Sequence, residues 1–253
     1  MIVIFDVDGV LIDVSKSYHY SIKDTVEYFT GKEANLEELL DIKFRFNINN
    51  DWDASIAGIL YVESGLLLED FKDEFKKFSS SLEDFYKFSI VYGIKLPDYN
   101  KLVEYFENRY KIHREKEELI FPTQVLEKVK NIATRTGVIT GRPFEDLDYS
   151  FKLFNLYKYF DKIITEDDIP ETHLRKPSAY PLKLFFEEIE YKEPVFYIGD
   201  TNSDKQMVEN FNLEENKNVN FVLRKNQHNL DINSNLKIEK PDEIFDILYN
   251  FSV

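Results

Sequence analysis

The feature that most constrains the fold is an alternation between two hydrophobic patterns. Residues 2–5 form a short, β-branched apolar run that stops abruptly at Asp6. A run of this kind fits a strand that is buried on both faces, as in a parallel sheet. Such strand–helix alternation predicts an α/β fold, a doubly wound parallel sheet with a Rossmann-like core. Similar short runs occur at 137–139, 162–165, 195–198 and 219–223, and helical patterns between them at 123–131, 144–160 and 180–189.

Residues 14–118 interrupt this alternation, because they carry helical periodicity and almost nothing that resembles a strand. The segment 15–30, for example, places Tyr18, Ile22 and Val26 on one stripe and ends at Gly31, a residue that favours helix termination. We therefore predict an α/β core built from residues 1–13 and 119–253, with an all-helical domain, 14–118, inserted after the first strand.

Charge and composition exclude several classes of function. The 253 residues contain 32 Lys and Arg against 47 Asp and Glu, a net charge of −15, which argues against nucleic acid and anionic membranes as partners. The chain has no cysteine, which excludes disulfides, zinc–thiolate sites and cysteine nucleophiles. It lacks a basic start and any apolar run near the ~20 residues of a membrane helix. We expect a cytoplasmic protein, and the sequence leaves its oligomeric state open.

Two pairs of acidic residues follow predicted strands. Asp6 and Asp8 come directly after the first strand, and Asp200 and Asp204 follow the run 195–198. Carboxylates this close repel one another, and a hard divalent cation with oxygen ligands, such as Mg²⁺, relieves that repulsion. The alternatives are an ordinary surface turn for the first pair and a helix N-cap for Asp204.

A hydroxyl and a lysine occupy similar places. Thr140, followed by Gly141 and Arg142, ends the run 137–139, and Lys176 precedes a helical pattern. A hydroxyl can donate to a bound anion and a lysine can neutralise phosphate, although a helix cap and a solvated loop lysine are the commoner uses. Doubly wound folds bind ligands at the carboxyl ends of their strands. Together, the acids, hydroxyl and lysine are the parts needed for phosphoryl transfer through an aspartyl phosphate.

The ordered motifs DVDGV, ITGRP, RKP and GDTNSD resemble those of the haloacid dehalogenase superfamily of phosphohydrolases. More narrowly, the chain resembles the phosphoglycolate-phosphatase-like branch, which carries a helical cap inserted after the first motif. The resemblance implies a Mg²⁺-dependent phosphatase that hydrolyses a small phosphomonoester, a small phosphorylated metabolite, through an aspartyl-phosphate intermediate.

The resemblance also implies roles for individual residues. Asp6 matches the nucleophile and Asp8 the general acid and base. Mg²⁺ would be held by the Asp6 carboxylate, the Asp8 backbone carbonyl and Asp200, while Asp204 would lie beside the metal or orient the lysine. The residues that match the binding site for the substrate phosphate are Thr140, Gly141 and Lys176.

Other readings stay open at this point. A phosphomutase would pass the phosphoryl group to a second hydroxyl on the same fold. A dehalogenase is disfavoured because Asp8 is retained, and a non-catalytic binding protein would not need the full acid and lysine set. The segment 49–52 of the predicted cap has no assigned role; Asp51 as a helix N-cap is its structural interpretation. Candidate contacts to the rest of the substrate are Arg142, Lys16, His19, Lys43 and Asn50.

Overall fold

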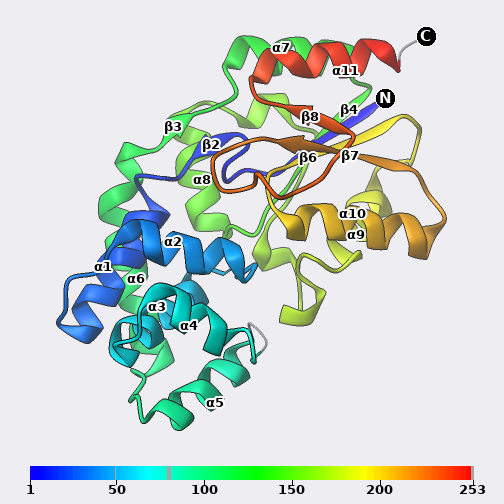
Figure 1. Cartoon of the computed structure of the whole chain (residues 1–253). Coiled ribbons are helices and arrows are strands. Elements are labelled where there is room, and N and C mark those ends of the chain that lie inside the picture. Colours follow the sequence, from blue (N-terminus) through cyan, green and yellow to red (C-terminus); the bar gives the residue numbers. More distant parts are fainter. Residues whose placement is uncertain (49, 79–80, 252–253) are drawn as a thin grey trace. The chain divides into compact units, whose positions relative to one another are not determined.

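The computed structural model describes residues 1–48, 50–78 and 81–251 and divides into two compact units (Figure 1). The sheet unit comprises Met1–Asp13 and Glu118–Val253, and the helical unit comprises Val14–Glu117. Glu118, which we expected in the insertion, belongs to the sheet unit because it pairs with Asp13 in a short antiparallel ribbon.

The sheet unit is built on six parallel strands in the order β5-β4-β1-β6-β7-β8, which confirms the predicted doubly wound sheet. The sequence did not predict β8 or the two-stranded ribbon β2–β3, because two or three residues are too few to establish a strand period. The strands are β1 Ile2–Phe5, β2 Ile12–Asp13, β3 Glu118–Leu119, β4 Arg135–Ile139, β5 Lys162–Ile164, β6 Val195–Gly199, β7 Val219–Arg224 and β8 Leu236–Ile238.

Helices flank both faces of this sheet. Figure 1 shows α7 and α11 on the side opposite α9 and α10. The helix predicted over 144–160 ends early, because Asn155 adopts the left-handed conformation (φ 54°) and a 3₁₀ turn follows at Tyr157–Tyr159. The helices of this unit are α7 Thr123–Ile132, α8 Phe144–Leu153, α9 Tyr180–Glu188, α10 Asn202–Glu215 and α11 Ile244–Asn250.

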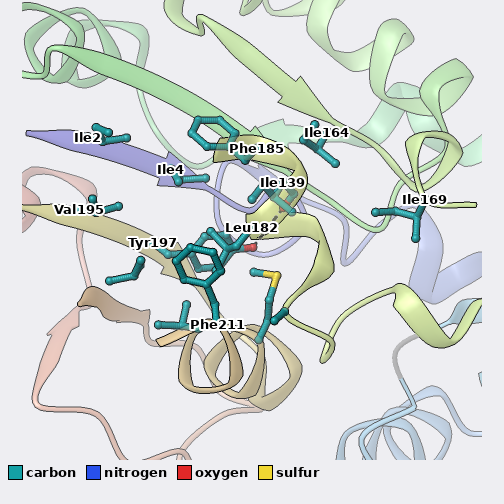
Figure 2. Close-up of a cluster of buried hydrophobic side chains, with 14 residues drawn as sticks. Ile2, Ile4, Ile139, Ile164, Ile169, Leu182, Phe185, Val195, Tyr197 and Phe211 are labelled. Carbon is teal, nitrogen blue, oxygen red and sulfur yellow. Dashed lines mark hydrogen bonds between the residues drawn. The ribbon is translucent and has the colours of Figure 1, made fainter. Parts of the chain in front are cut away.

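The alternation of side chains along β1 divides the core between the two faces. Ile2 and Ile4 point into a cluster with side chains of α9 and α10 such as Leu182 (Figure 2). Phe5 points to the other face, where its ring lies 5.3 Å from that of Phe121. Burying one such side chain contributes about 1.5–3 kcal/mol. Both faces of the sheet are covered by apolar side chains. The polar residues that follow β1 therefore lie beyond the carboxyl end of this strand.

The helical unit contains six α-helices within its described residues: α1 Tyr18–Thr30, α2 Leu36–Arg45, α3 Asp51–Ser64, α4 Leu68–Phe75, α5 Leu82–Tyr92 and α6 Tyr99–His113. Its core is rich in aromatic rings, and Tyr18 of α1 stacks on Tyr110 of α6 at 4.3 Å. Phe71 and Phe75 of α4 are completely buried. In the described parts of both units, no helix combines the length and the apolar character needed to cross a membrane.

Candidate active site

The strand order brings the four sequence motifs together at the carboxyl end of the parallel sheet. β1 lies between β4 and β6, and Phe5, its last residue, pairs with Val138 on one side and Ile198 on the other. The backbone N–H of Asp6 donates to the carbonyl of Ile198 at 2.9 Å. Since the strands are parallel, the residues that follow them emerge at the same edge.

Three buried carboxylates converge there. One oxygen from each of Asp6, Asp200 and Asp204 lies within 4.8 Å of the others, and the three residues are 6%, 8% and 0% exposed. The Nζ of Lys176 donates to Asp6 and to Asp204, each at 2.8 Å. One lysine against three carboxylates leaves an excess of negative charge, which is costly at this depth unless a further cation balances it.

Asp200 supplies a specific indication of where a balancing cation would bind. Its Oδ2 accepts from the side chain of Asn226 at 2.8 Å, whereas its Oδ1 is buried and has no hydrogen-bond partner. Gly9 (φ 71°) makes this arrangement feasible, because a Cβ there would lie 2.2 Å from Asp200 Oδ2. An orphaned carboxylate oxygen beside two further carboxylates is the donor set that a hard cation such as Mg²⁺ requires.

The protonation equilibria of the cluster reflect the same imbalance. Burial raises the pKa of Asp6 to about 7 despite the opposing attraction of Lys176. Burial likewise raises the pKa of Asp200 well above its ordinary value, with repulsion from Asp204 adding to the effect. Burial would also raise the pKa of Asp204, but the charge and hydrogen bond of Lys176 hold it below the usual range. Lys176 therefore opposes the effect of burial at both Asp6 and Asp204.

Asp204 stabilises the start of α10 and also accepts hydrogen bonds within the carboxylate cluster. Its Oδ2 accepts from the backbone N–H and hydroxyl of Thr201, at 3.1 and 2.6 Å, in a capping box that begins α10. Its Oδ1 accepts from Lys176 and from the hydroxyl of Tyr197, at 2.8 and 2.9 Å. The N-cap of α10 is therefore Thr201, which corrects the N-cap alternative for Asp204: one oxygen of Asp204 completes the capping box from inside the helix, and the other accepts from the lysine.

Asp8 forms an ion pair with Arg142. The Nε of Arg142 donates to Asp8 Oδ1, and its Nη1 donates to the hydroxyl of Ser150 at 2.8 Å. The Arg142 side chain is 0% exposed, while that of Asp8 is 33% exposed. Arg142 thus lies buried against Asp8 with its guanidinium bound to protein partners, and its expected contact to substrate stays a prediction.

The segment that follows β4 presents a hydroxyl and an open glycine. Thr140 is 4% exposed, and its Oγ1 accepts from the backbone N–H of Arg142 at 3.1 Å. Because that bond uses a lone pair, the hydroxyl proton remains available to donate. Gly141 is exposed, and no atom lies within 4 Å of the position of a Cβ there.

Two candidate substrate contacts in the helical unit have local structural partners. Lys43 forms an ion pair with Asp51. Asn50 Oδ1 accepts from the backbone N–H groups of Trp52 and Asp53, at 2.9 and 3.1 Å, so it caps α3. The N-cap is therefore Asn50, one residue before the Asp51 that the structural interpretation favoured, because Asn50 has an extended backbone (φ −90°, ψ 130°) and its amide oxygen accepts from the free N–H groups of the first helical turn.

The other two candidates also lie in the helical unit. His19 is buried, and its ring is 6.0 Å from that of Phe44 in an edge-on arrangement. Lys16 is exposed at the start of the unit. Asn49, the first residue of the segment whose role the sequence left open, falls outside the described residues.

Sequence reasoning missed several members of the site. Tyr197 lies within the apolar run of β6 and was counted only as core. Its hydroxyl oxygen lies 2.9 Å from Asp204 Oδ1 and 3.1 Å from the carbonyl oxygen of Ile139 (Figure 2), so these two acceptors share its single proton. Asn226 and Asn229 follow β7, and both donate to Asp200. The rule that ligand-binding residues follow parallel strands, applied to the run 219–223, points to these two asparagines.

Comparison with known proteins agrees with this architecture. Residues 3–215 match the model of the haloacid dehalogenase-like hydrolase family, so the chain belongs to that family. It is 26% identical, over 80% of this chain and 74% of the relative, to a protein described as "Putative pyrophosphatase PpaX" from Caldanaerobacter subterraneus subsp. tengcongensis. All four motifs lie within the matched residues, and Asn226 and Asn229 lie beyond them.

Solved structures share the fold. The phosphatase Tt82 from Thermococcus thioreducens superposes with a TM-score of 0.69 at 23% identity, over 98% of this chain and 99% of that one. A protein described as "putative phosphoglycolate phosphatase" from Lactobacillus delbrueckii subsp. bulgaricus gives a TM-score of 0.68 at 16% identity, over 97% of each chain. At these identities the likeness concerns the fold.

Proposed function

We propose that the protein is a Mg²⁺-dependent phosphatase that hydrolyses a small phosphomonoester through an aspartyl phosphate on Asp6. The observation that carries the proposal is the incomplete charge balance at the end of β1. Asp6 is buried beside one lysine and two further carboxylates, and Asp200 Oδ1 has no partner. A site built to hold excess negative charge, within a family of hydrolases, fits a bound cation that in turn binds a phosphate.

The residues that fit Mg²⁺ are the carboxylates of Asp6 and Asp200, with Asp204 beside them and the Asp8 backbone carbonyl as a further oxygen. When bound, the ion would neutralise phosphoryl charge and orient the phosphate for in-line attack. Lys176 already bridges Asp6 and Asp204 and would contribute a second positive charge toward the phosphoryl oxygens.

The covalent step uses the carboxylate of Asp6 as the nucleophile. One of its oxygens forms a bond to phosphorus while the ester bond breaks, and the leaving oxygen takes a proton from Asp8. Water then attacks phosphorus, gives a proton back to Asp8 and breaks the bond to Asp6, which releases inorganic phosphate. The partial exposure of Asp8 suits a group that must reach both a leaving group and water.

Three further residues support these two steps. Arg142 holds Asp8 from behind through a buried ion pair and thereby limits the directions in which that carboxylate can turn. The hydroxyl of Thr140 donates to a phosphoryl oxygen, and the open side of Gly141 leaves room for the phosphate to approach the backbone. The backbone N–H of Arg142 also donates to Thr140 Oγ1. Arg142 thereby contacts both Asp8 and the segment proposed to bind phosphate.

The test is a panel of phosphorylated metabolites and p-nitrophenyl phosphate, assayed for inorganic phosphate with Mg²⁺ and with a chelator. We expect phosphate release that requires Mg²⁺. Transfer of the phosphoryl group to a second sugar hydroxyl without phosphate release would instead identify the phosphomutase alternative. Activity that is equal with and without the chelator would overturn the proposal.

A further inference from the structure

Two asparagines from the segment between β7 and β8 bind Asp200 at different atoms. Asn226 Nδ2 donates to the carboxylate at Oδ2, and Asn229 Nδ2 donates to the backbone carbonyl, each at 2.8 Å. Asn229 also donates to the carbonyl of Arg224 at 2.8 Å, which ties the segment to the end of β7. Main chain and side chain of Asp200 are thus held from the same segment.

The direction of the Asn226 amide follows from its other bond. Its Oδ1 accepts from the backbone N–H of His228 at 2.8 Å, so the NH₂ group must be the one that faces Asp200. The backbone N–H of Asn226 in turn donates to Asn229 Oδ1 at 2.9 Å. The two asparagines therefore lock each other in one arrangement.

A neutral donor has a specific consequence for a carboxylate that binds metal. An arginine or lysine in this place would orient Asp200 and also neutralise it, whereas an amide orients it and leaves its charge for the cation. With Oδ2 occupied by the amide, Oδ1 is the oxygen that stays buried without a partner. Hydrogen-bond partners behind a metal ligand fix its geometry and commonly set the affinity for the metal.

We propose that Asn226 is a positioning residue for metal binding, which holds Asp200 so that its unpartnered oxygen faces the cation. The proposal rests on the proposed function, since it needs a cation at the carboxylate cluster. The alternative is that Asn226 only shapes its own turn, because the bond from His228 is a common turn contact of asparagine.

The experiment measures the dissociation constant for Mg²⁺ alone, by calorimetric titration of the full chain freed of metal with a chelator. Asn226→Ala should raise this constant by ~10–100-fold, the usual effect of losing a partner behind a metal ligand. Hydrolysis of p-nitrophenyl phosphate should then need correspondingly more Mg²⁺ and should approach the wild-type kcat when Mg²⁺ is saturating.

Asn226→Ser covers the case in which the alanine variant fails to fold. A serine hydroxyl can still accept from His228 and preserve the turn, but it is too short to replace the donor to Asp200. It should weaken Mg²⁺ binding as strongly as alanine does.

Asn212→Ala is the matched control. Asn212 is also partly buried and also makes one accepted and one donated bond, to the N–H and carbonyl of Val219 at 2.7 and 2.9 Å. Its loss should lower the melting temperature and leave the Mg²⁺ constant within about twofold of wild type, the precision expected where no metal ligand is disturbed. If Asn226→Ser binds Mg²⁺ as the wild type does, the positioning role is wrong while the proposed function stands. If the wild type itself binds no Mg²⁺, both fall.

Discussion

Asp24 in the helical unit and Asp200 in the sheet unit show two opposite treatments of an aspartate. Asp24 Oδ2 accepts from Arg109 Nε at 2.7 Å and lies 2.8 Å from His113 Nε2. Burial alone would raise the pKa of Asp24, but the hydrogen bonds from His113 and Arg109 lower this pKa below its ordinary value. Burial instead raises the pKa of Asp200, whose carboxylate receives a neutral amide and has one oxygen without a partner.

The difference teaches how to separate a structural charge from a functional one. In the helical unit, Lys43 and Asn50 are satisfied by neighbours close in sequence, and the charge of Asp24 is balanced by groups of α6. The carboxylates of the sheet unit come from motifs far apart in the chain and leave their charge unbalanced. An incomplete balance, maintained at an energetic cost, indicates a site that a ligand completes.

The largest expected effect is the loss of the nucleophile. Asp6→Asn should lower kcat for p-nitrophenyl phosphate by on the order of 10⁶-fold, the scale on which a covalent enzyme suffers without its nucleophile. Asp24→Asn, the matched change in the helical unit, should leave kcat unchanged. A comparable loss in both variants would erase the distinction between the two regions.

Breaking the buried pair behind Asp8 should have the next largest effect. Arg142→Gln removes the charge that orients Asp8, and a catalytic group that is misplaced by a small distance commonly costs ~10²-fold in rate. Steady-state assays should show this loss in kcat with a smaller change in KM. Arg109→Gln, which removes a partner of Asp24, should alter stability by about 0–1 kcal/mol and spare kcat. A rise in KM alone for Arg142→Gln would assign that arginine to substrate binding.

Replacing Asp200 and replacing Asp24 should change the melting temperature in opposite directions. In the metal-free protein, Asp200→Asn removes an uncompensated buried charge and should raise the melting temperature by about 2–4 °C, equivalent to 1 kcal/mol. Asp24→Asn removes a compensated charge and should lower it. The stabilisation of the wild type by Mg²⁺ should be weakened in Asp200→Asn. Parallel shifts in both variants would contradict the contrast between Asp24 and Asp200.

The pH dependence of the same melts has a defined direction. Because burial raises the pKa of Asp6 to about 7 and that of Asp200 well above its usual range, folding of the metal-free chain takes up protons. The associated stability is present below the ordinary carboxyl range and is lost as the pH rises through the folded pKa values. The melting temperature of the chelated wild type should therefore fall as the pH rises from ~4, the ordinary carboxyl pKa, to about 7, the folded pKa of Asp6. Saturating Mg²⁺ should flatten this fall.

The smallest effect concerns the cap of α3. Asn50→Ala should reduce the free energy of unfolding by ~1 kcal/mol, measured by denaturant titration, because it removes the acceptor for two helix N–H groups. Asn50→Asp, which keeps that acceptor, should retain most of the stability. Equal kcat/KM for the wild type and both variants, across the metabolite panel, would mark the residue as structural. A loss confined to one metabolite would restore it as a specificity residue.

The sequence was sufficient for five of the six strands of the sheet and for the motifs that follow them, because short apolar runs and the acids that end them are local signals. Asp6, Thr140 and Asp200 each follow such a run. The direction of a side chain could not be predicted from these local signals. The sequence left Arg142 open as a ligand contact, and the structure shows it buried against Asp8.

Bonds between distant elements were also out of reach of the sequence. The hydroxyl of Tyr197 lies within hydrogen-bond distance of the carbonyl of Ile139 at the end of β4, and Asn226 reaches Asp200 from the segment after β7. Nothing in the residues next to either one predicts these partners, because they depend on strand order and register. The helical unit showed helical periodicity but no motif comparable to those of the sheet unit. From the sequence, Lys43 and Asn50 could therefore be substrate contacts or structural residues.

The most direct test of the account is to trap the covalent intermediate in Asp8→Asn. p-Nitrophenolate leaves without needing a proton, so this variant should still form the aspartyl phosphate, while the lack of a base slows its hydrolysis by ~10²–10⁴-fold. After incubation with p-nitrophenyl phosphate and Mg²⁺, acid quenching and peptide mass spectrometry should locate the phosphoryl group on Asp6, with none formed in the presence of a chelator. A phosphoryl group on another residue, or turnover with no covalent intermediate at any time point, would contradict the central claim that Asp6 is the nucleophile.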